Sequence, residues 1–126
     1  MILVIGGVYQ GKLKYALGRF GLAAGDVYYC DAGDAGLPCG KKIIYELDKW
    51  ILALIKNGED SDDHIMRFIA QNRDAVVICN DISCGVVPVD SALRKWREAV
   101  GRALMELTRE SGEVIRLFCG IPSRLK

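Results

Sequence analysis

The chain has 126 residues, of which 51% are hydrophobic and 26% charged, and its formal net charge is +1 at pH 7. This length predicts one domain over residues 1–126, and the scattered cations exclude an extended nucleic-acid-binding surface. No apolar run approaches the length of a membrane span, and Met1 leads directly into a predicted strand without room for a signal peptide. Five cysteines without C-x-x-C spacing favour a reduced, cytoplasmic protein.

The chain begins with a predicted strand, a glycine-rich loop and a helix. Met1–Ile5 is continuously apolar, which is typical of the interior of a parallel sheet, and a helix is expected over Lys12–Phe20. Between them, GGVYQGK has the spacing of the phosphate-binding P-loop, G-x-x-x-x-G-K. Glycines allow successive backbone N–H groups to face phosphate oxygens, and the helix N-terminus and Lys12 add positive charge.

Leu13 departs from the P-loop pattern. A Ser or Thr hydroxyl normally follows the lysine and ligates the magnesium ion of the nucleotide, and a leucine has no oxygen for this purpose. Phosphate binding and phosphoryl transfer are therefore separate questions. The alternative is that the glycines form only a tight strand-to-helix turn. The strand before and the helix after favour phosphate binding, for which the candidate residues are Gly6, Gly7, Val8, Tyr9, Gln10, Gly11, Lys12 and Leu13.

Strands and helices are then predicted to alternate along the chain. A strand over Val27–Cys30 and a loop over Asp31–Gly40 are followed by a helix over Lys42–Lys56, closed by Asn57-Gly58, and a helix over Ser61–Gln71 with Ser61 as its cap. A strand over Ala75–Cys79 and a loop over Asn80–Asp90 come next, and the chain continues with a helix that Asp90 or Ser91 caps and Gly112 ends and with a strand over Val114–Cys119. The expected core stripe of this last helix is Leu93, Trp96, Val100, Leu104 and Leu107. This alternation predicts an α/β fold with a mainly parallel sheet covered on both faces. Ligands of such sheets bind at the carboxyl ends of the strands.

Two aspartates follow apolar strands, and both are candidate catalytic or magnesium-binding residues. Asp31 follows VYYC and Asp81 follows VVICN. Nucleotide-hydrolysing P-loop proteins place an acidic residue there to hold hydrated Mg²⁺, although Asp also commonly starts a turn. His64 is the only histidine, and three cysteines lie in apolar strand-like runs, where a thiol is usually buried. A zinc site or a Cys–His nucleophile pair is therefore disfavoured.

The C-terminal third carries a specific resemblance. Val76 to Lys126 resembles the bifunctional adenosylcobinamide kinase/adenosylcobinamide-phosphate guanylyltransferase family of cobalamin biosynthesis. That family has a pattern close to N-E-x-G-x-G-I-V-P, an F-R-D-like triplet and a G-I-P-x-x-L-K ending, together with an N-terminal G-G-x-x-S-G-K-S loop. The counterparts here are Asn80-Asp81, Cys84 to Pro88, Arg94, Trp96-Arg97-Glu98, Gly101, Gly120-Ile121-Pro122, Leu125-Lys126 and Gly6 to Leu13.

The chain also departs from this family pattern. Besides Leu13, Tyr45 takes the place of an aspartate that precedes C-L-T-L-W in the family, and Leu104-Met105 replaces an N-Q pair. The family's segment with the guanylylated histidine corresponds to a short loop without histidine, and His64 lies on the far side of Trp50.

The resemblance implies a three-layer P-loop NTPase-like (RecA-like) domain that binds ATP or GTP, with Mg²⁺ and a corrinoid substrate as further ligands and a homo-oligomer as its state. The departures imply weakened kinase chemistry and lost guanylyltransferase chemistry, which leaves open whether the chain is an enzyme. The alternatives are a non-catalytic, nucleotide- or corrinoid-responsive binding or assembly protein, or a domain that serves only in oligomerisation.

Overall fold

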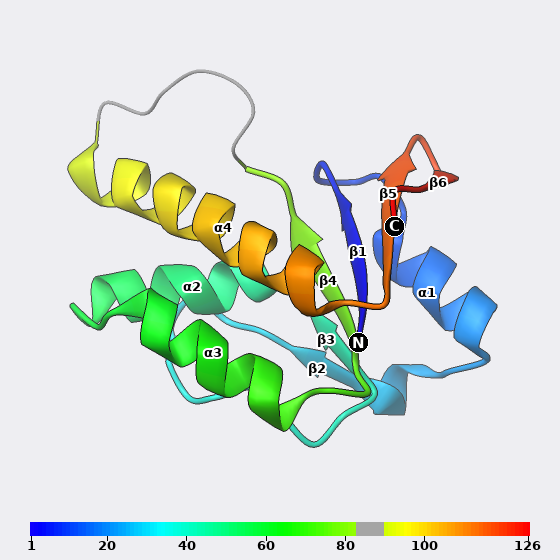
Figure 1. The fold of residues 1–126 in the computed structure, drawn as a ribbon, viewed down its shortest axis with the longest axis horizontal. Coiled ribbons are helices and arrows are strands. Elements are labelled where there is room, and N and C mark those ends of the chain that lie inside the picture. The colour runs from blue at the N-terminus through cyan, green and yellow to red at the C-terminus, as the bar shows by residue number, and fades with distance from the viewer. Residues whose placement is uncertain (83–89) are drawn as a thin grey trace.

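A six-stranded sheet forms the centre of the protein (Figure 1). The computed structural model describes residues 1–82 and 90–126, and the strand count refers to these residues. The sheet order is β2-β3-β4-β1-β5-β6, and only β6 runs antiparallel to its neighbour. The strands are β1 (Ile2–Gly6), β2 (Val27–Tyr29), β3 (Ile43–Tyr45), β4 (Val76–Asn80), β5 (Glu113–Phe118) and β6 (Ile121–Arg124).

Helices cover both faces of the sheet. One face carries α1 (Lys12–Phe20), and the other carries α2 (Leu47–Lys56), α3 (Ser61–Gln71) and α4 (Ser91–Glu110), as Figure 1 shows; a short 3-10 turn spans Ala24–Asp26. The predicted fold class, a three-layer P-loop NTPase-like domain with a mainly parallel sheet, is confirmed. No helix in the described parts of the chain is long and apolar enough to span a membrane.

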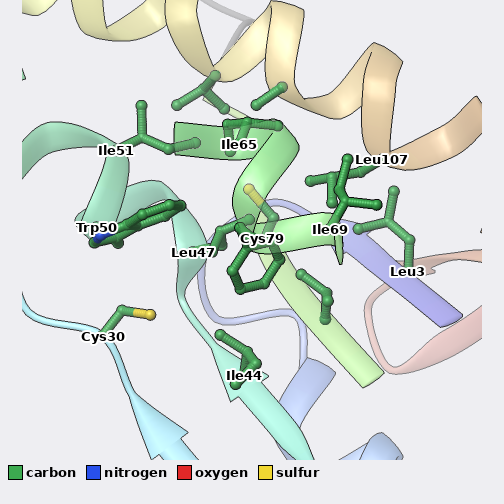
Figure 2. Packing of buried hydrophobic residues seen from close by; sticks show 14 of the residues in the cluster. Leu3, Cys30, Ile44, Leu47, Trp50, Ile51, Ile65, Ile69, Cys79 and Leu107 are labelled. Carbon is green, nitrogen blue, oxygen red and sulfur yellow. The ribbon is translucent and has the colours of Figure 1, made fainter. Parts of the chain in front are cut away.

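The core lies in two layers because successive side chains of a strand point to opposite faces. Leu3 packs toward α2, α3 and α4, whereas Val4 packs toward α1, and both are fully buried. Trp50, labelled in Figure 2, and Phe68 are the largest side chains of the first layer, and their ring centroids lie 5.5 Å apart. The prediction that Trp50 belongs to the core is confirmed.

The predicted helix over 42–56 begins too early, because Ile43–Tyr45 forms β3 and the helix starts only at Leu47. Glu46 separates the two elements with a φ of 59°, in the left-handed region that ends regular structure. Ile43 and Ile44 are both fully buried but pack in opposite layers, as strand residues do. In the sequence, Ile43 and Ile44 also continue the helical spacing of the apolar residues in the following helix, which is why they were assigned to it.

Helix caps and burial correct further details. The side chain of Asp60, not Ser61, caps α3 by accepting a hydrogen bond from the N–H of Asp62 at 3.0 Å. Asp90, one of the two expected caps, caps α4. The core stripe expected for α4 is confirmed except at Leu93, which is 39% exposed: Val100 and Leu107 are buried, and Trp96 and Leu104 pack against the core. Ala99 and Ala103 are buried in addition. Small side chains there allow the helix to pack closely on α2 and α3.

The C-terminal end of the chain forms a hairpin, which the sequence did not predict as such. The expected strand over 114–119 runs from Glu113 to Phe118, and Cys119 lies exposed in the turn to β6 with a φ of 51°. Of the predicted loop over 80–90, Asn80 ends β4 and residues 83–89 lie outside the described residues.

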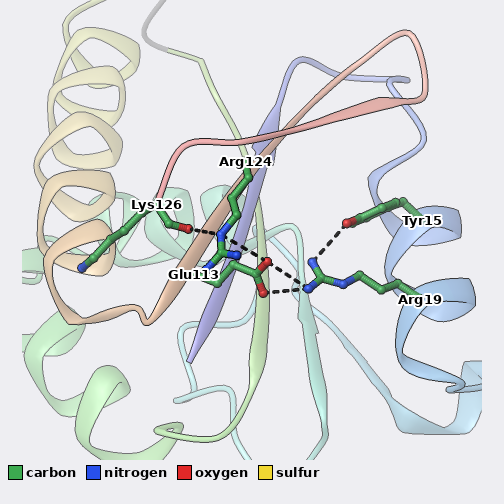
Figure 3. Close-up of polar contacts among 5 residues, drawn as sticks. All are labelled: Tyr15, Arg19, Glu113, Arg124 and Lys126. Carbon is green, nitrogen blue, oxygen red and sulfur yellow. Dashed lines mark hydrogen bonds and ion pairs between the residues drawn. The ribbon is translucent and has the colours of Figure 1, made fainter.

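Charged side chains fasten this hairpin to both helical layers (Figure 3). Arg19 of α1 donates to both carboxylate oxygens of Glu113, at 2.8 and 2.9 Å, and to the Tyr15 hydroxyl at 3.1 Å. The Nε atom of Arg124 lies 3.8 Å from Oε2 of the same carboxylate. The ammonium of Lys126 donates to the Thr108 carbonyl at the end of α4, at 2.9 Å. The hairpin is thereby held in place beside β1.

Candidate functional site

The loop between β1 and α1, residues 7–11, is shaped by glycines at its two ends. A Cβ atom on Gly6 would lie 2.5 Å from the carbonyl oxygen of Leu117 on β5, so only glycine allows the two strands to approach here. Gly11 precedes α1 with a φ of 83°, a left-handed conformation that glycine adopts without strain. The predicted strand–loop–helix context of the P-loop sequence is therefore present.

The backbone N–H groups of this loop have no acceptor in the described part of the chain. Among the hydrogen bonds formed between described residues, none uses the N–H groups of residues 7–13. A helix N-terminus leaves such groups free for an anion. Lys12 is 5% exposed, and its ammonium donates to the Gly7 carbonyl across the loop. Burial lowers the pKa of Lys12, and attraction to Asp48 opposes that shift.

Two other strand ends hold the loop in position. The side-chain oxygen of Gln10 accepts a hydrogen bond from the N–H of Cys119, and its backbone carbonyl accepts from the N–H of Gly120 at 3.1 Å. At the opposite side, the N–H of Asp81 donates to the Gly6 carbonyl at 2.9 Å. The loop is thus fixed by the β5–β6 turn and by the end of β4.

The structure separates the two predicted aspartates. Asp81 lines a pocket of about 170 Å³ beside the loop, with Ile5, Gly6, Gly7, Gln10, Arg116, Leu117 and Phe118. Asp31 follows β2 at the edge of the sheet, where β3 and β4 stand between it and β1. Its carboxylate is exposed and accepts a hydrogen bond from the N–H of Gly33 at 2.8 Å, as in an Asx turn. Only Asp81 is therefore brought next to the loop.

A third acidic residue, Asp48, was missed by the sequence analysis. It lies in the first turn of α2 and is 3% exposed. Its two carboxylate oxygens accept hydrogen bonds from the backbone N–H and side-chain amide of Asn80, at 3.1 and 3.3 Å, and its carbonyl accepts one from the Trp96 indole at 2.8 Å. Burial raises the pKa of Asp48, against the effect of the Asn80 hydrogen bonds. The signal in the sequence that could have identified Asp48 is the position of this acid within the mostly apolar segment LDKWILALI.

A metal ion of a nucleotide would need oxygen ligands from this chain. Asp81 lines the pocket beside the loop. Asp48 is buried, with both carboxylate oxygens hydrogen-bonded to Asn80, and Leu13 offers no oxygen. Its side chain instead packs on the apolar cluster under α1, which includes Val4 and Ala16. A hydrated Mg²⁺ at this loop would find the Asp81 carboxylate beside it and no hydroxyl at position 13.

Comparison with known families adds to this geometry. A family model described as cobinamide kinase / cobinamide phosphate guanyltransferase matches residues 42–125, which is more than half of the chain. The chain belongs to this family. Membership supports a cobinamide kinase- or guanylyltransferase-like role in cobalamin biosynthesis, and members of the cobinamide kinase family use nucleotide substrates. The match runs from before β3 to β6 and does not include the P-loop sequence. No curated protein matches the chain.

Two residues bear on how this chain compares with the cobinamide kinase family pattern. Tyr45, which stands where the family pattern has an aspartate, ends β3 and packs edge-on against Tyr29, with ring centroids 5.7 Å apart. Burial raises the pKa of its hydroxyl to about 12. His64 lies on α3, as expected, with its ring edge-on to Trp50 and 3.9 Å from the Glu59 carboxylate.

Proposed function

We propose that this family member binds the phosphates of ATP or GTP at residues 6–13, with weakened kinase chemistry and without guanylyltransferase chemistry. The observation that carries the proposal is the pairing of a buried lysine with loop N–H groups that bond to no acceptor among the described residues. Backbone donors and a lysine together form a phosphate-binding cradle. The family's place in cobalamin biosynthesis suggests a corrinoid-linked alcohol as the substrate of any phosphoryl transfer that survives.

Within this proposal, each loop residue has a stated part. Lys12 neutralises phosphate charge, the N–H groups from Gly7 to Leu13 donate to phosphate oxygens, and Gly6 and Gly11 permit the curvature. Asp81 is favoured over Asp31 as the residue that would hold a hydrated Mg²⁺ because it lies beside the loop. A bound Mg²⁺ would neutralise charge on the terminal phosphates.

A second candidate function is a non-catalytic protein that responds to a nucleotide or a corrinoid. Leu13 and Tyr45 favour it, because neither side chain offers the oxygen that the family pattern provides there. Titration with ATP, GTP and cobinamide, with binding and turnover measured separately, distinguishes the two functions. A homo-oligomer is part of both proposals, and sedimentation velocity with and without nucleotide tests it.

We expect ATP, GTP and inorganic pyrophosphate to raise the thermal stability of the protein. A ligand that binds only the folded state, at about a hundredfold over its dissociation constant, stabilises it by roughly 2.7 kcal/mol. Differential scanning fluorimetry at millimolar ligand measures the shift. Lys12→Ala should abolish it, because the variant lacks the buried ammonium that lies against the loop at the Gly7 carbonyl.

Lys14→Ala is the matched control for this experiment. It removes the same charge from the same helix, but Lys14 is exposed, so its ligand-induced shift should stay close to that of the unaltered protein. If none of the three ligands stabilises the unaltered protein, residues 6–13 form only a turn. Equal loss in both variants would point to general charge attraction instead of a defined site.

Guanylylation of a histidine should be absent. His64 lies on α3, where its ring contacts Trp50 and its Nε2 atom lies near the Glu59 carboxylate. Neither contact involves residues 6–13. Incubation with labelled GTP, followed by gel separation at alkaline pH, should leave the chain unlabelled. Acid-labile, hydroxylamine-resistant label that disappears in His64→Ala would contradict this expectation.

A further inference from the structure

An arginine of β5 lines the pocket beside the start of the loop. Arg116 is exposed and shares this pocket of about 170 Å³ with Gly7, the first residue of the loop, and with Asp81. In the sheet it is the register partner of Ile5, which lies two residues before Gly7 in the chain. A cation that the P-loop pattern does not include therefore stands where β1 ends and the loop begins.

The direction of the Arg116 side chain follows from its neighbours in β5. Ile115 and Leu117 are both buried in the layer under α1. Because side chains alternate along a strand, Arg116 points to the opposite face, which carries α2, α3 and α4 (Figure 1). Lys12 comes from α1, and its ammonium donates to the Gly7 carbonyl. The two cations thus approach Gly7 from different faces of the sheet.

The guanidinium of Arg116 is available to a ligand. Its side chain forms no hydrogen bond or ion pair with any described residue, including Asp81 in the same pocket. By contrast, Arg19 and Arg124, on the other face of the hairpin, both pair with Glu113. Arg116 therefore keeps all its donors for an anion that enters the pocket.

The pocket is too small for a nucleoside. Pockets that hold whole small molecules measure roughly 300–1,000 Å³, whereas this one measures about 170 Å³. A phosphate chain whose inner groups lie on the N–H groups before α1 would reach the pocket with its free end. An anion there lies near the carboxylate of Asp81, which repels it, and Arg116 supplies the opposite charge. This charge comes from the chain itself, at a loop where Leu13 offers no oxygen to a metal ion.

We propose that Arg116 is a further ligand-binding residue of the loop, one that binds the terminal phosphate of a nucleoside triphosphate. Lys12 and the loop N–H groups then bind the phosphates nearer the nucleoside. This inference rests on the proposed phosphate binding at residues 6–13. A guanidinium donates two parallel hydrogen bonds to one phosphate group, whereas an ammonium acts as a point charge. The chain is therefore expected to prefer triphosphates over diphosphates without the help of a divalent cation.

Calorimetric titration with ATP, ADP, GTP and GDP, at pH 7 in the presence of EDTA, tests the inference. Each triphosphate that binds the unaltered chain should do so about tenfold more tightly than its diphosphate, because only the third phosphate meets Arg116. Arg116→Gln should lose this preference and keep the diphosphate affinity. Lys12→Ala should weaken the binding of both classes. Arg116→Lys should retain part of the preference, since it keeps the charge without the paired donors.

Arg67→Gln is the matched control, because Arg67 is exposed on α3 and does not line this pocket. It should keep the tenfold preference. Arg116 is also exposed, so its variants are expected to fold, and thermal melting checks this. Three results overturn the inference alone: equal binding of triphosphate and diphosphate by the unaltered chain, an unchanged preference in Arg116→Gln, or an equal loss in Arg67→Gln. If the unaltered chain binds none of the four nucleotides, the proposed phosphate binding fails, and the inference fails with it.

Discussion

Gly6→Ala should lower the free energy of unfolding by about 2–3 kcal/mol. The added methyl group would lie 2.5 Å from the Leu117 carbonyl oxygen, which belongs to the neighbouring strand and has no free rotation to avoid it. The φ of 154° at this position adds backbone strain for any residue with a side chain. Either β1 and β5 separate or the loop changes shape, so phosphate binding should also be lost. Urea unfolding and pyrophosphate calorimetry measure the two effects.

Gly7→Ala is the matched control, one residue further along the same loop. Its added methyl group would meet only the flexible side chain of Gln10, at 3.8 Å, and Gly7 is not among the glycines with positive φ. We expect a change in stability within about 0.5 kcal/mol, as at ordinary exposed positions. Equal stability of the two alanine variants would contradict the view that Gly6 is required for the approach of β1 to β5.

Turnover of cobinamide by the unaltered chain should be weak or absent. Phosphoryl transfer depends on positioning and on neutralisation of charge by a metal ion, and loss of one preorganised partner costs roughly a hundred- to a thousandfold in rate. Leu13 packs into the apolar cluster under α1 in place of offering a hydroxyl. Coupled kinase assays with ATP and GTP measure the rate. A turnover of about one per second or faster, typical of kinases, would show that another residue holds the metal.

Leu13→Ser tests the same argument by restoring the hydroxyl that the P-loop pattern has at this position. The serine should increase the dependence of nucleotide binding on Mg²⁺, although it also removes an apolar side chain from the cluster. Leu17→Ser is the control, because Leu17 lies on the same helix and packs on the same cluster. It should cause a similar loss of stability without any change in Mg²⁺ dependence. A change in both variants would attribute the effect to packing.

Much of the fold could be predicted because the buried strands and amphipathic helices leave clear patterns. Val76–Asn80 is buried at every position, so an uninterrupted apolar run was a sufficient signal for β4. Ile43–Tyr45 was assigned to a helix because a three-residue strand is too short to show a period of two. The positive φ of Glu46, which ends that strand, has no signature in a residue that usually favours helices. The local sequence pattern therefore did not predict β3, a short strand that only the tertiary fold stabilises.

The site was predictable only where its chemistry is local in the sequence. Gly6, Gly11 and Lys12 follow one another at a fixed spacing, and the structure gives them the expected context. The buried position of Asp48 could not be predicted, because it depends on a hydrogen bond to Asn80, which is 32 residues away in the sequence. Asp31 and Asp81 looked alike in the sequence, since the sheet order alone decides which strand end neighbours β1. Parallel topology, and not residue type, separates the two aspartates.

The position of β1 in the sheet has a consequence for how the chain folds during synthesis. This strand is made long before its two partners, since Ile2 pairs with Val76 on one side and with Glu113 on the other. Contacts between such distant residues make folding slow, and an apolar strand that waits for its partners is open to association with other chains. Gln10 likewise acquires its partners only when Cys119 and Gly120 have emerged. The loop over residues 7–11 is thus synthesised well before the strand ends that fix it, and it takes its final shape only after them.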